Sequence, residues 1–210
     1  YKRQIQPHVW SCKNLSDRKY AASVIKDSLV THGHLLAICG ALLHADALQY
    51  ALINGKPAGP LEINGFIDNF TSIPSVIHEI YELNNFWLPN WEIMSGNKLP
   101  EEVERIRLES KEYLSKALNA AKENSDISDK YKSAINALEC NKDSRRGAAT
   151  NTAIASSLLC HFYKNSSPYE AIISCVNVLG TDTDSIGSMA GAILGCYNGC
   201  LLYTSPSPRD

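Results

Sequence analysis

Apolar residues recur at the spacing of an α-helix along most of this chain. In the first third, this spacing predicts a helix from about Asp17 to Val30 that begins at a Ser16 cap. The next segment, Leu35 to Ile53, is apolar on nearly all sides and is interrupted by only a few polar side chains. Because charged and strongly polar side chains are costly inside a bilayer, we interpret it as a buried helix and not as a membrane span.

The second half of the chain repeats this pattern with clearer start signals. The segment 99–123 is amphipathic, has Pro100 where no backbone N–H is needed, and carries its charges on a face expected to meet water. Shorter apolar-periodic segments at 127–138 and 153–163 predict two further helices. The stretch Ser167–Glu170 (Ser-Pro-Tyr-Glu) is a capping box that predicts another helix, ending near residue 178.

No stretch alternates between apolar and polar residues as a half-buried strand does. Three segments rich in turn-forming or polar residues, 54–70, 84–97 and 141–152, are expected to lack regular structure, with a helix from near Pro74 to Leu83 between the first two. The predicted fold class is therefore all-α, a compact multi-helix bundle.

Composition narrows the class of protein further. The chain has 210 residues, 44% hydrophobic residues and 20% charged residues, which suits one globular domain with a sizeable core. A net charge of −2 leaves no electrostatic footprint for nucleic acid or an anionic membrane. The seven cysteines are odd in number, and no Cys-x-x-Cys occurs. We therefore expect free, buried thiols in a reducing, cytoplasmic compartment. We also expect the protein to be a monomer.

The strongest chemical signal is the run 179–199, LGTDTDSIGSMAGAILGCYNG, in which acidic and hydroxyl side chains precede a small-residue helix from Ile186. Asp182, Asp184 and Ser185 place hard oxygen ligands together at a helix start, which suits magnesium, calcium or manganese. One such residue could instead merely cap the helix. Because capping needs only one, we favour a metal site.

This run resembles the C-terminal motif of the ADP-ribosylglycohydrolase family (the dinitrogenase-reductase-activating glycohydrolase type), written GGDTDT before an Ala/Gly-rich helix. Here Thr181 replaces the second glycine, and Ser185 replaces the last threonine while keeping its hydroxyl. The resemblance implies an all-α ADP-ribosylglycohydrolase-like bundle. It also implies metal ligands at Asp182, Asp184 and Ser185, with Asp182 and Asp184 as catalytic residues.

A second resemblance lies in Thr31-His32-Gly33-His34, which is similar to the family's Thr-His-x-His segment before a long Ala-rich helix. On that basis we assign substrate binding, near the ribose and phosphate of the ligand, to His32 and then to His34. By themselves these histidines could also be a turn and a cap, and no third ligand at zinc spacing lies nearby. His44, inside the next apolar segment, is expected to be a packed core histidine.

The activity implied by the resemblance is hydrolysis of the glycosidic bond that joins ADP-ribose to an acceptor on a protein or small molecule. Mg²⁺, as two ions in the full domain, is the implied cofactor. Full-length relatives supply half of the metal site from an upstream Thr-Asp-Asp, whereas this chain has no adjacent Asp-Asp pair. We therefore expect residues 1–199 to be the middle and C-terminal part of one domain, incomplete at the N-terminus and impaired in activity, and 200–210 to be a non-native, disordered tail.

Three alternatives remain open at this point. The chain could be a non-catalytic ADP-ribose- or nucleotide-binding protein, or a crystallin-like structural protein with the same fold. The two aspartates could act as a glycosidase pair without metal. The third alternative, ranked last, is a hydrolase whose nucleophile lies beside a histidine. Only Cys160 and His161 are neighbours, and successive helical residues point about 100° apart.

The last helix also contains a row of glycines. Gly187, Gly191 and Gly195 recur every fourth residue, which predicts close packing against a neighbouring backbone.

Overall fold

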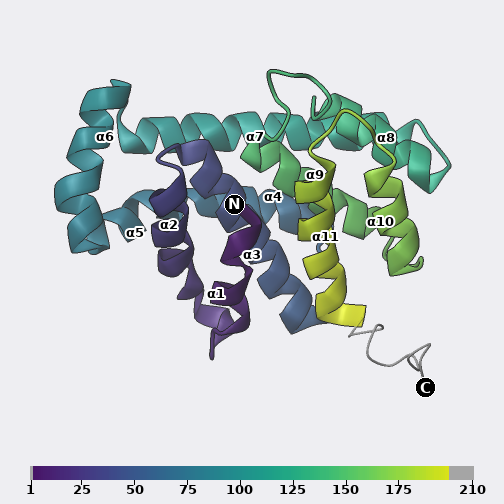
Figure 1. Cartoon of the computed structure of the whole chain (residues 1–210), viewed down its shortest axis with the longest axis horizontal. Coiled ribbons are helices and arrows are strands. Elements are labelled where there is room, and N and C mark those ends of the chain that lie inside the picture. Colours follow the sequence, from purple (N-terminus) through teal and green to yellow (C-terminus); the bar gives the residue numbers. More distant parts are fainter. Residues whose placement is uncertain (1, 199–210) are drawn as a thin grey trace.

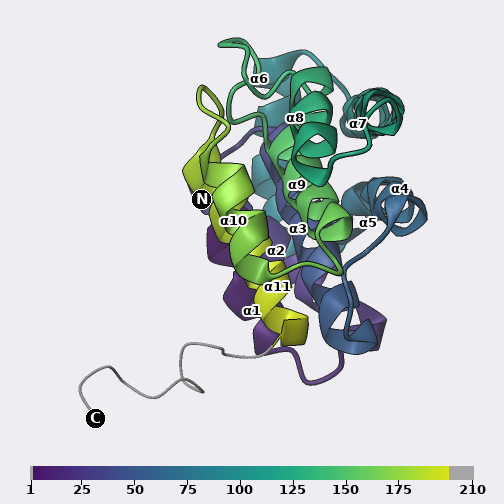
Figure 2. The same ribbon diagram turned by 90° about the vertical axis from the view of Figure 1, so that its right-hand side faces the viewer.

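The protein, seen here as a computed structural model that describes residues 2–198, is built from helices (Figures 1 and 2). No strand occurs within that range, which confirms the all-α prediction. The predicted tail at 200–210 lies outside the described residues. The α-helices are α1 (Gln6–Trp10), α2 (Tyr20–Thr31), α3 (Leu35–Asn54), α4 (Pro60–Asp68), α5 (Ile73–Glu79), α6 (Leu88–Ser95), α7 (Leu99–Lys122), α8 (Ile127–Ala137), α9 (Ala149–Phe162), α10 (Pro168–Val176) and α11 (Thr183–Asn198). Shorter turns of helix are η1 (Lys2–Ile5), η2 (Leu15–Asp17), η3 (Asn69–Ser72) and the π-helical η4 (Leu83–Trp87).

Helices α3 and α9 form the centre of the molecule. They pack against each other, and both also contact α11. Figure 2 shows α10 and α11 on one side of this pair and α4 and α7 on the other. The buried side chains of these layers make one continuous hydrophobic core. The chain is therefore organised around the three packed helices α3, α9 and α11, which we call the central helices.

Helix α3 is buried, as its composition predicts. It is long and apolar enough to cross a bilayer, but 67% of its most apolar window is buried inside the protein, as in the core helix of a globular domain. Its histidine, His44, is completely buried, which confirms the prediction of a core histidine. The helix ends at Gly55, whose φ of +61° is a left-handed conformation that glycine adopts without strain.

One contact between α3 and α9 explains why they can be central. A Cβ atom added to Gly40 of α3 would lie only 2.5 Å from the backbone carbonyl carbon of Ala149, the first residue of α9. No side chain fits in that space, so glycine lets the two backbones approach closely. The sequence pattern contains no signal that singles out this glycine.

The glycine row in α11 does not pack closely against a neighbouring backbone, so that prediction is wrong. A Cβ atom added to Gly191 or Gly195 would meet nothing within 4 Å, and one added to Gly187 would meet only the sulfur atom of Cys175, at 3.9 Å. Both Gly191 and Gly195 are exposed. Helix spacing located the row on one face of α11, but that face is not the one that packs against α3 and α9.

Two segments predicted to be irregular contain helices. Within 54–70, α4 forms because Ile63, Phe66 and Ile67 fall on one buried face after a Pro60 start. Within 84–97, η4 and α6 form a nearly continuous helix in which Trp87 and Trp91, four residues apart, stack with ring centroids 5.7 Å apart. Burial of one face stabilises α4, whereas in η4 and α6 only Leu88 is buried, and Trp87 and Trp91 are partly buried against the core. In both segments turn-forming residues disguise the helical period.

Several helix starts also differ from the prediction. Helix α2 begins at Tyr20 and not after Ser16, because Arg18 has φ +53° and breaks the helical path. Helix α9 begins at Ala149, four residues earlier than expected. Its early polar residues are buried with their hydrogen bonds made, as when the amide of Asn151 donates to the carbonyl of Leu138 at 2.7 Å. The α10 start is confirmed, with the Ser167 hydroxyl accepting from the backbone of the new helix.

Candidate active site at the N-terminal ends of the central helices

The acidic motif lies at the start of α11. The turn before it uses Gly180 at φ +85°, a region that side chains other than glycine rarely adopt. The carbonyl of Asp182 then accepts the backbone N–H of Ile186 at 3.0 Å, so Asp182 lies at the cap position and the helix begins at Thr183. The side chain of Asp184 is in the first turn and exposed, while Asp182 and Ser185 are half-buried. The helix therefore begins about one turn earlier than Ile186, with Asp182 at its cap position and Asp184 in its first turn.

The carboxylate of Asp182 lies against the loop that leads into α9. A Cβ atom on Gly147 would be 3.3 Å from Oδ2 of Asp182, and Gly147 has φ +75°. A side chain at 147 would thus be strained and would also press on the carboxylate. This contact joins the acidic motif to the polar stretch 141–152, to which the sequence alone assigned no residue-specific role.

The two arginines of that loop are engaged elsewhere. The guanidinium of Arg145 pairs with the carboxylate of Glu109 on α7 and lies over the ring of Tyr113, 5.3 Å from its centroid. Arg146 pairs with Asp143 at 2.7 Å. The Arg145 contacts hold the loop against α7, whereas the Arg146 pair lies within the loop itself.

The histidines of the Thr31-His32-Gly33-His34 bend occupy the link between α2 and α3 and are exposed. Nδ1 of His32 lies 3.0 Å from the hydroxyl oxygen of Thr31. Nδ1 of His34 accepts the backbone N–H of Leu36 at 3.1 Å, so this histidine is the N-cap of α3. Both the turn and the cap are therefore present, and the assignment of these side chains to substrate binding stays a prediction.

The bend and the acidic motif lie at the same end of the molecule. Both α3 and α11 begin at the upper side of Figure 1 and run downward in contact with each other. The start of α9 links them, because Ala149 packs on Gly40 of α3 while Gly147 lies against Asp182. The N-terminal ends of the three central helices thus lie on the same side of the molecule, and each carries partial positive charge from its backbone.

A feature that the sequence analysis missed lies beside the bend. A cavity of about 630 Å³ is lined by Gly33 and by aromatic and apolar side chains of η4 and α6, among them Phe86, Trp87, Trp91 and Met94. Phe86 and Met94 are largely exposed. The cluster of aromatic residues between 84 and 97 was the available signal, but only the fold places it next to His32 and His34.

The donor set at Asp182, Asp184 and Ser185 has the right chemistry for Mg²⁺ but is small. Among the described residues, no group of three or more His, Cys, Asp or Glu side chains converges to hold a metal ion. Magnesium is commonly held by one or two carboxylates, with water and substrate phosphates completing six positions. These residues therefore fit one side of a Mg²⁺ site whose remaining ligands would come from elsewhere.

The cysteine–histidine alternative does not form a catalytic pair. Cys160 is fully buried with its thiol directed to the carbonyl of Ala190 at 3.6 Å, and burial raises the pKa of that thiol. His161 is half-buried and lines a cavity at the far end of the central helices. Four of the described cysteines are buried, as expected for thiols that pack as apolar groups.

Comparison with protein families agrees with this architecture. The family model described as ADP-ribosylglycohydrolase matches residues 7–201. Comparisons with curated proteins and with solved structures return no significant match. The family match covers the bend, the central helices and the acidic motif together. On these grounds, the chain belongs to the ADP-ribosylglycohydrolase family.

Proposed function

We propose that this protein hydrolyses the glycosidic bond between ADP-ribose and an acceptor at the face where the central helices begin. The observation that carries the proposal is the packing of the Asp182 carboxylate against Gly147, immediately before α9. That contact joins the acidic motif to the end of the core that also holds the His32–His34 bend. Family membership supports glycohydrolase activity in general, and the substrate and metal are parts of the proposal.

The geometry suits an ADP-ribosyl group in three ways. Helix N-termini favour anions, so the face where α3, α9 and α11 begin suits a pyrophosphate. The cavity beside Gly33 has apolar, aromatic walls against which a base or an acceptor group can pack. Asp182 and Asp184 provide carboxylates at the ribose, where charge develops as the glycosidic bond breaks.

We assign Mg²⁺ binding to the carboxylates of Asp182 and Asp184 and the hydroxyl of Ser185. A bound divalent ion would supply Lewis-acid stabilisation and orientation of water and sugar hydroxyls. The protein residues hold and orient the ribose between the acidic first turn of α11 and the loop ending at Gly147. Because few carboxylates converge here, we expect weak Mg²⁺ binding and slow turnover by these 210 residues.

Calorimetric titration of ADP-ribose, with and without Mg²⁺, tests this proposal. For the wild type, Mg²⁺ should tighten binding roughly tenfold, about 1.4 kcal/mol. The variant Asp184→Asn should lose that difference, while Asp129→Asn on the exposed start of α8 should keep it. Equal affinity under all conditions and in all three proteins would remove the metal and Asp184 from the site.

A hydrolysis assay separates the enzyme from the non-catalytic alternative. Release of ADP-ribose from arginine- or serine-linked substrates that disappears in Asp184→Asn supports the hydrolase. Binding of ADP-ribose without any release over long incubation would instead favour a binding protein. Release that persists without divalent ions would favour a metal-free pair of carboxylates.

A further inference from the structure

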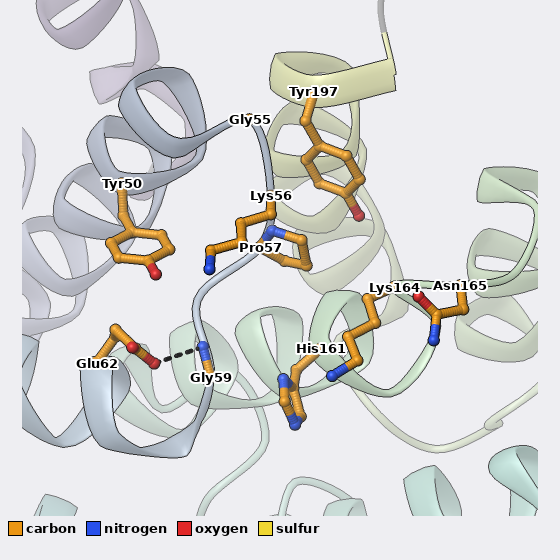
Figure 3. Close-up of a pocket in the computed structure, with 10 residues that line it drawn as sticks. All are labelled: Tyr50, Gly55, Lys56, Pro57, Gly59, Glu62, His161, Lys164, Asn165 and Tyr197. Carbon is orange, nitrogen blue, oxygen red and sulfur yellow. Dashed lines mark hydrogen bonds between the residues drawn. The ribbon is translucent and has the colours of Figure 1, made fainter.

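A second cavity lies at the opposite end of the central helices, where they finish (Figure 3). Its volume is about 330 Å³. Its walls come from the last turns of α3, α9 and α11 and from the link between α3 and α4. We call it the basal pocket, and the lining residues used below are Tyr50, Lys56, Glu62, His161, Lys164 and Tyr197.

The basal pocket is well separated from the acidic motif. Asp184 and Tyr197 lie on the same helix, thirteen residues apart, which corresponds to about 20 Å along its axis. His161 likewise lies in the last turn of α9, whereas Ala149 begins that helix beside the motif. A ligand in the basal pocket therefore cannot touch the proposed active site.

Two lysines give this pocket a surplus of positive charge. Lys56 comes from the α3–α4 link and Lys164 follows the end of α9. Within residues 2–198, no ion pair or side-chain hydrogen bond engages either ammonium group, whereas six other lysines there have a carboxylate partner. Figure 3 shows Lys56 extending toward Tyr50 and Lys164 extending toward His161.

The one carboxylate in the pocket is already used. Oε2 of Glu62 accepts the backbone N–H of Gly59 at 2.9 Å and thereby caps α4 (Figure 3). The backbone carbonyls at the ends of the helices are also occupied, since Gly55 donates to Ala51 and Tyr163 donates to Leu159. The lysine ammonium groups are therefore not needed to cap the helix-terminal carbonyls, and they are available to bind an anion.

Neutral donors complete the lining. The hydroxyl of Tyr197 is buried without a hydrogen-bond partner, and burial raises its pKa, so it keeps its proton at neutral pH. In Figure 3 it points toward Lys164 and Asn165. Burial lowers the pKa of His161, Lys164 lowers it further and Glu62 raises it, so the ring is neutral at pH 7 and carries one N–H donor.

We propose that the basal pocket binds a small organic monophosphate, with the phosphate held by Lys56 and Lys164 and the organic part packed against Tyr50 and Tyr197. Unpaired ammonium groups and an unpartnered hydroxyl are the donors that phosphate oxygens require. The volume lies at the lower end for ligand sites, which suits one ring and one phosphate better than a dinucleotide. No residue of the proposed active site takes part.

Titrations of the whole chain with ribose 5-phosphate, AMP and inorganic phosphate test this site, with ribose as the uncharged control. Ribose 5-phosphate should saturate, ribose should not, and inorganic phosphate should bind more weakly. Replacing both lysines, Lys56→Gln with Lys164→Gln, should weaken ribose 5-phosphate binding at least tenfold. The matched pair Lys13→Gln with Lys26→Gln removes the same charge from exposed positions outside the pocket and should leave affinity unchanged.

Three further measurements test the site independently of the lysine variants. The ring signals of His161 should shift and its pKa should rise as ribose 5-phosphate binds, and Asp184→Asn should bind it as the wild type does. Tyr197→Phe, which removes only the hydroxyl, should weaken binding several-fold if the double lysine variant fails to fold. Equal affinity in the pocket and control variants would overturn the site, and equal affinity for inorganic phosphate and ribose 5-phosphate would overturn the organic part.

Discussion

The same three helices build both ends of the core, yet the two ends carry opposite chemistry. At the end where α3, α9 and α11 begin, the polar side chains are the histidines of the bend and the acids Asp182 and Asp184. At the end where they finish, the cavity is lined by Lys56 and Lys164. Acids at helix starts and bases after helix ends follow the helix dipole, so part of this contrast is expected of any parallel helix bundle.

Each end also has polar groups that the helix dipole does not explain, and these groups differ between the two ends. The start of α11 has two acids and a hydroxyl where one cap would suffice, and one of its carboxylates lies against Gly147. The finish has ammonium groups without partners within the described part of the chain and a buried hydroxyl on Tyr197 without one. A helix dipole accounts for the sign of the charge at each end, and these additional groups are the basis of the two proposed ligand sites.

The largest expected effect comes from the polar group that lies between the two ends. Asp46, 1% exposed in the middle of α3, accepts from Arg18 at 3.0 and 2.9 Å, from the Tyr20 hydroxyl at 2.7 Å and from Asn69 at 2.8 Å. Asp46→Ala should lower the free energy of unfolding by about 3–5 kcal/mol, because it leaves buried donors and a cation without partners. Urea denaturation measures this.

Asp46→Ala should also weaken ligand binding at both ends of the core, because the central helices that it loosens build both ends. The control is Asp129→Ala, which removes an exposed ion pair with Lys132 and should cost less than about 1 kcal/mol. A loss below 1 kcal/mol for Asp46→Ala would contradict the role of this network.

The next effect concerns the contact that links α3 to α9 near the proposed active site. Gly40→Ala places a methyl group 2.5 Å from the backbone of Ala149. We expect a loss of about 1–3 kcal/mol in the free energy of unfolding, because backbone cannot yield as a flexible side chain does. ADP-ribose affinity should fall more than phosphate affinity at the basal pocket, and the opposite order would argue against this assignment of the two ends.

The third effect is a dependence of stability on pH that comes from α3 and not from either end. Burial lowers the pKa of His44 to about 3, below the ordinary value of 6.5. Between these two pH values the unfolded chain binds a proton that the folded chain does not. Stability should therefore be full above pH 6.5 and fall as the pH drops below it, by about 1.4 kcal/mol per pH unit.

Urea denaturation of wild type and His44→Gln at pH 7.0 and 5.5 measures this slope. The variant should lose most of the difference between the two pH values, whereas the exposed His78→Gln should retain it. An unchanged slope in His44→Gln would mean that other groups, including His161 in the basal pocket, dominate the acid sensitivity.

The smallest effect has the opposite sign and tests the exposed face of α11. Gly191→Ala meets no atom within 4 Å and replaces a glycine inside a helix. It should raise the free energy of unfolding by up to about 1 kcal/mol, as alanine loses less conformational freedom. Thermal melts of the wild type, Gly191→Ala and Gly40→Ala measure this difference, because the two variants should change stability in opposite directions. A destabilised Gly191→Ala would show that this face of α11 is packed.

Much of the fold follows from the order of residues alone, because the forces that start and stop a helix act over about four residues. The period of α7, the proline at its start and the Ser167 cap of α10 are local, and the structure confirms them. The burial of α3 and of His44 is also predictable from the sequence, because a helix that is apolar on all sides has no polar face to expose to water. The motif at 180–185 is likewise local, and the family that it indicates is confirmed by the family match.

Only the tertiary structure decided which of these pieces meet. The approach of Gly147 to Asp182, the close packing of Gly40 on Ala149 and the gathering of Lys56 and Lys164 around one cavity join residues that lie far apart in the chain. It also decided that the glycines of α11 face outward and that helices form within 54–70 and 84–97. Local propensity is worth about 1 kcal/mol per residue or less, so the burial of a helix face, as in α4, overrides it, and that burial is a property of the packed bundle.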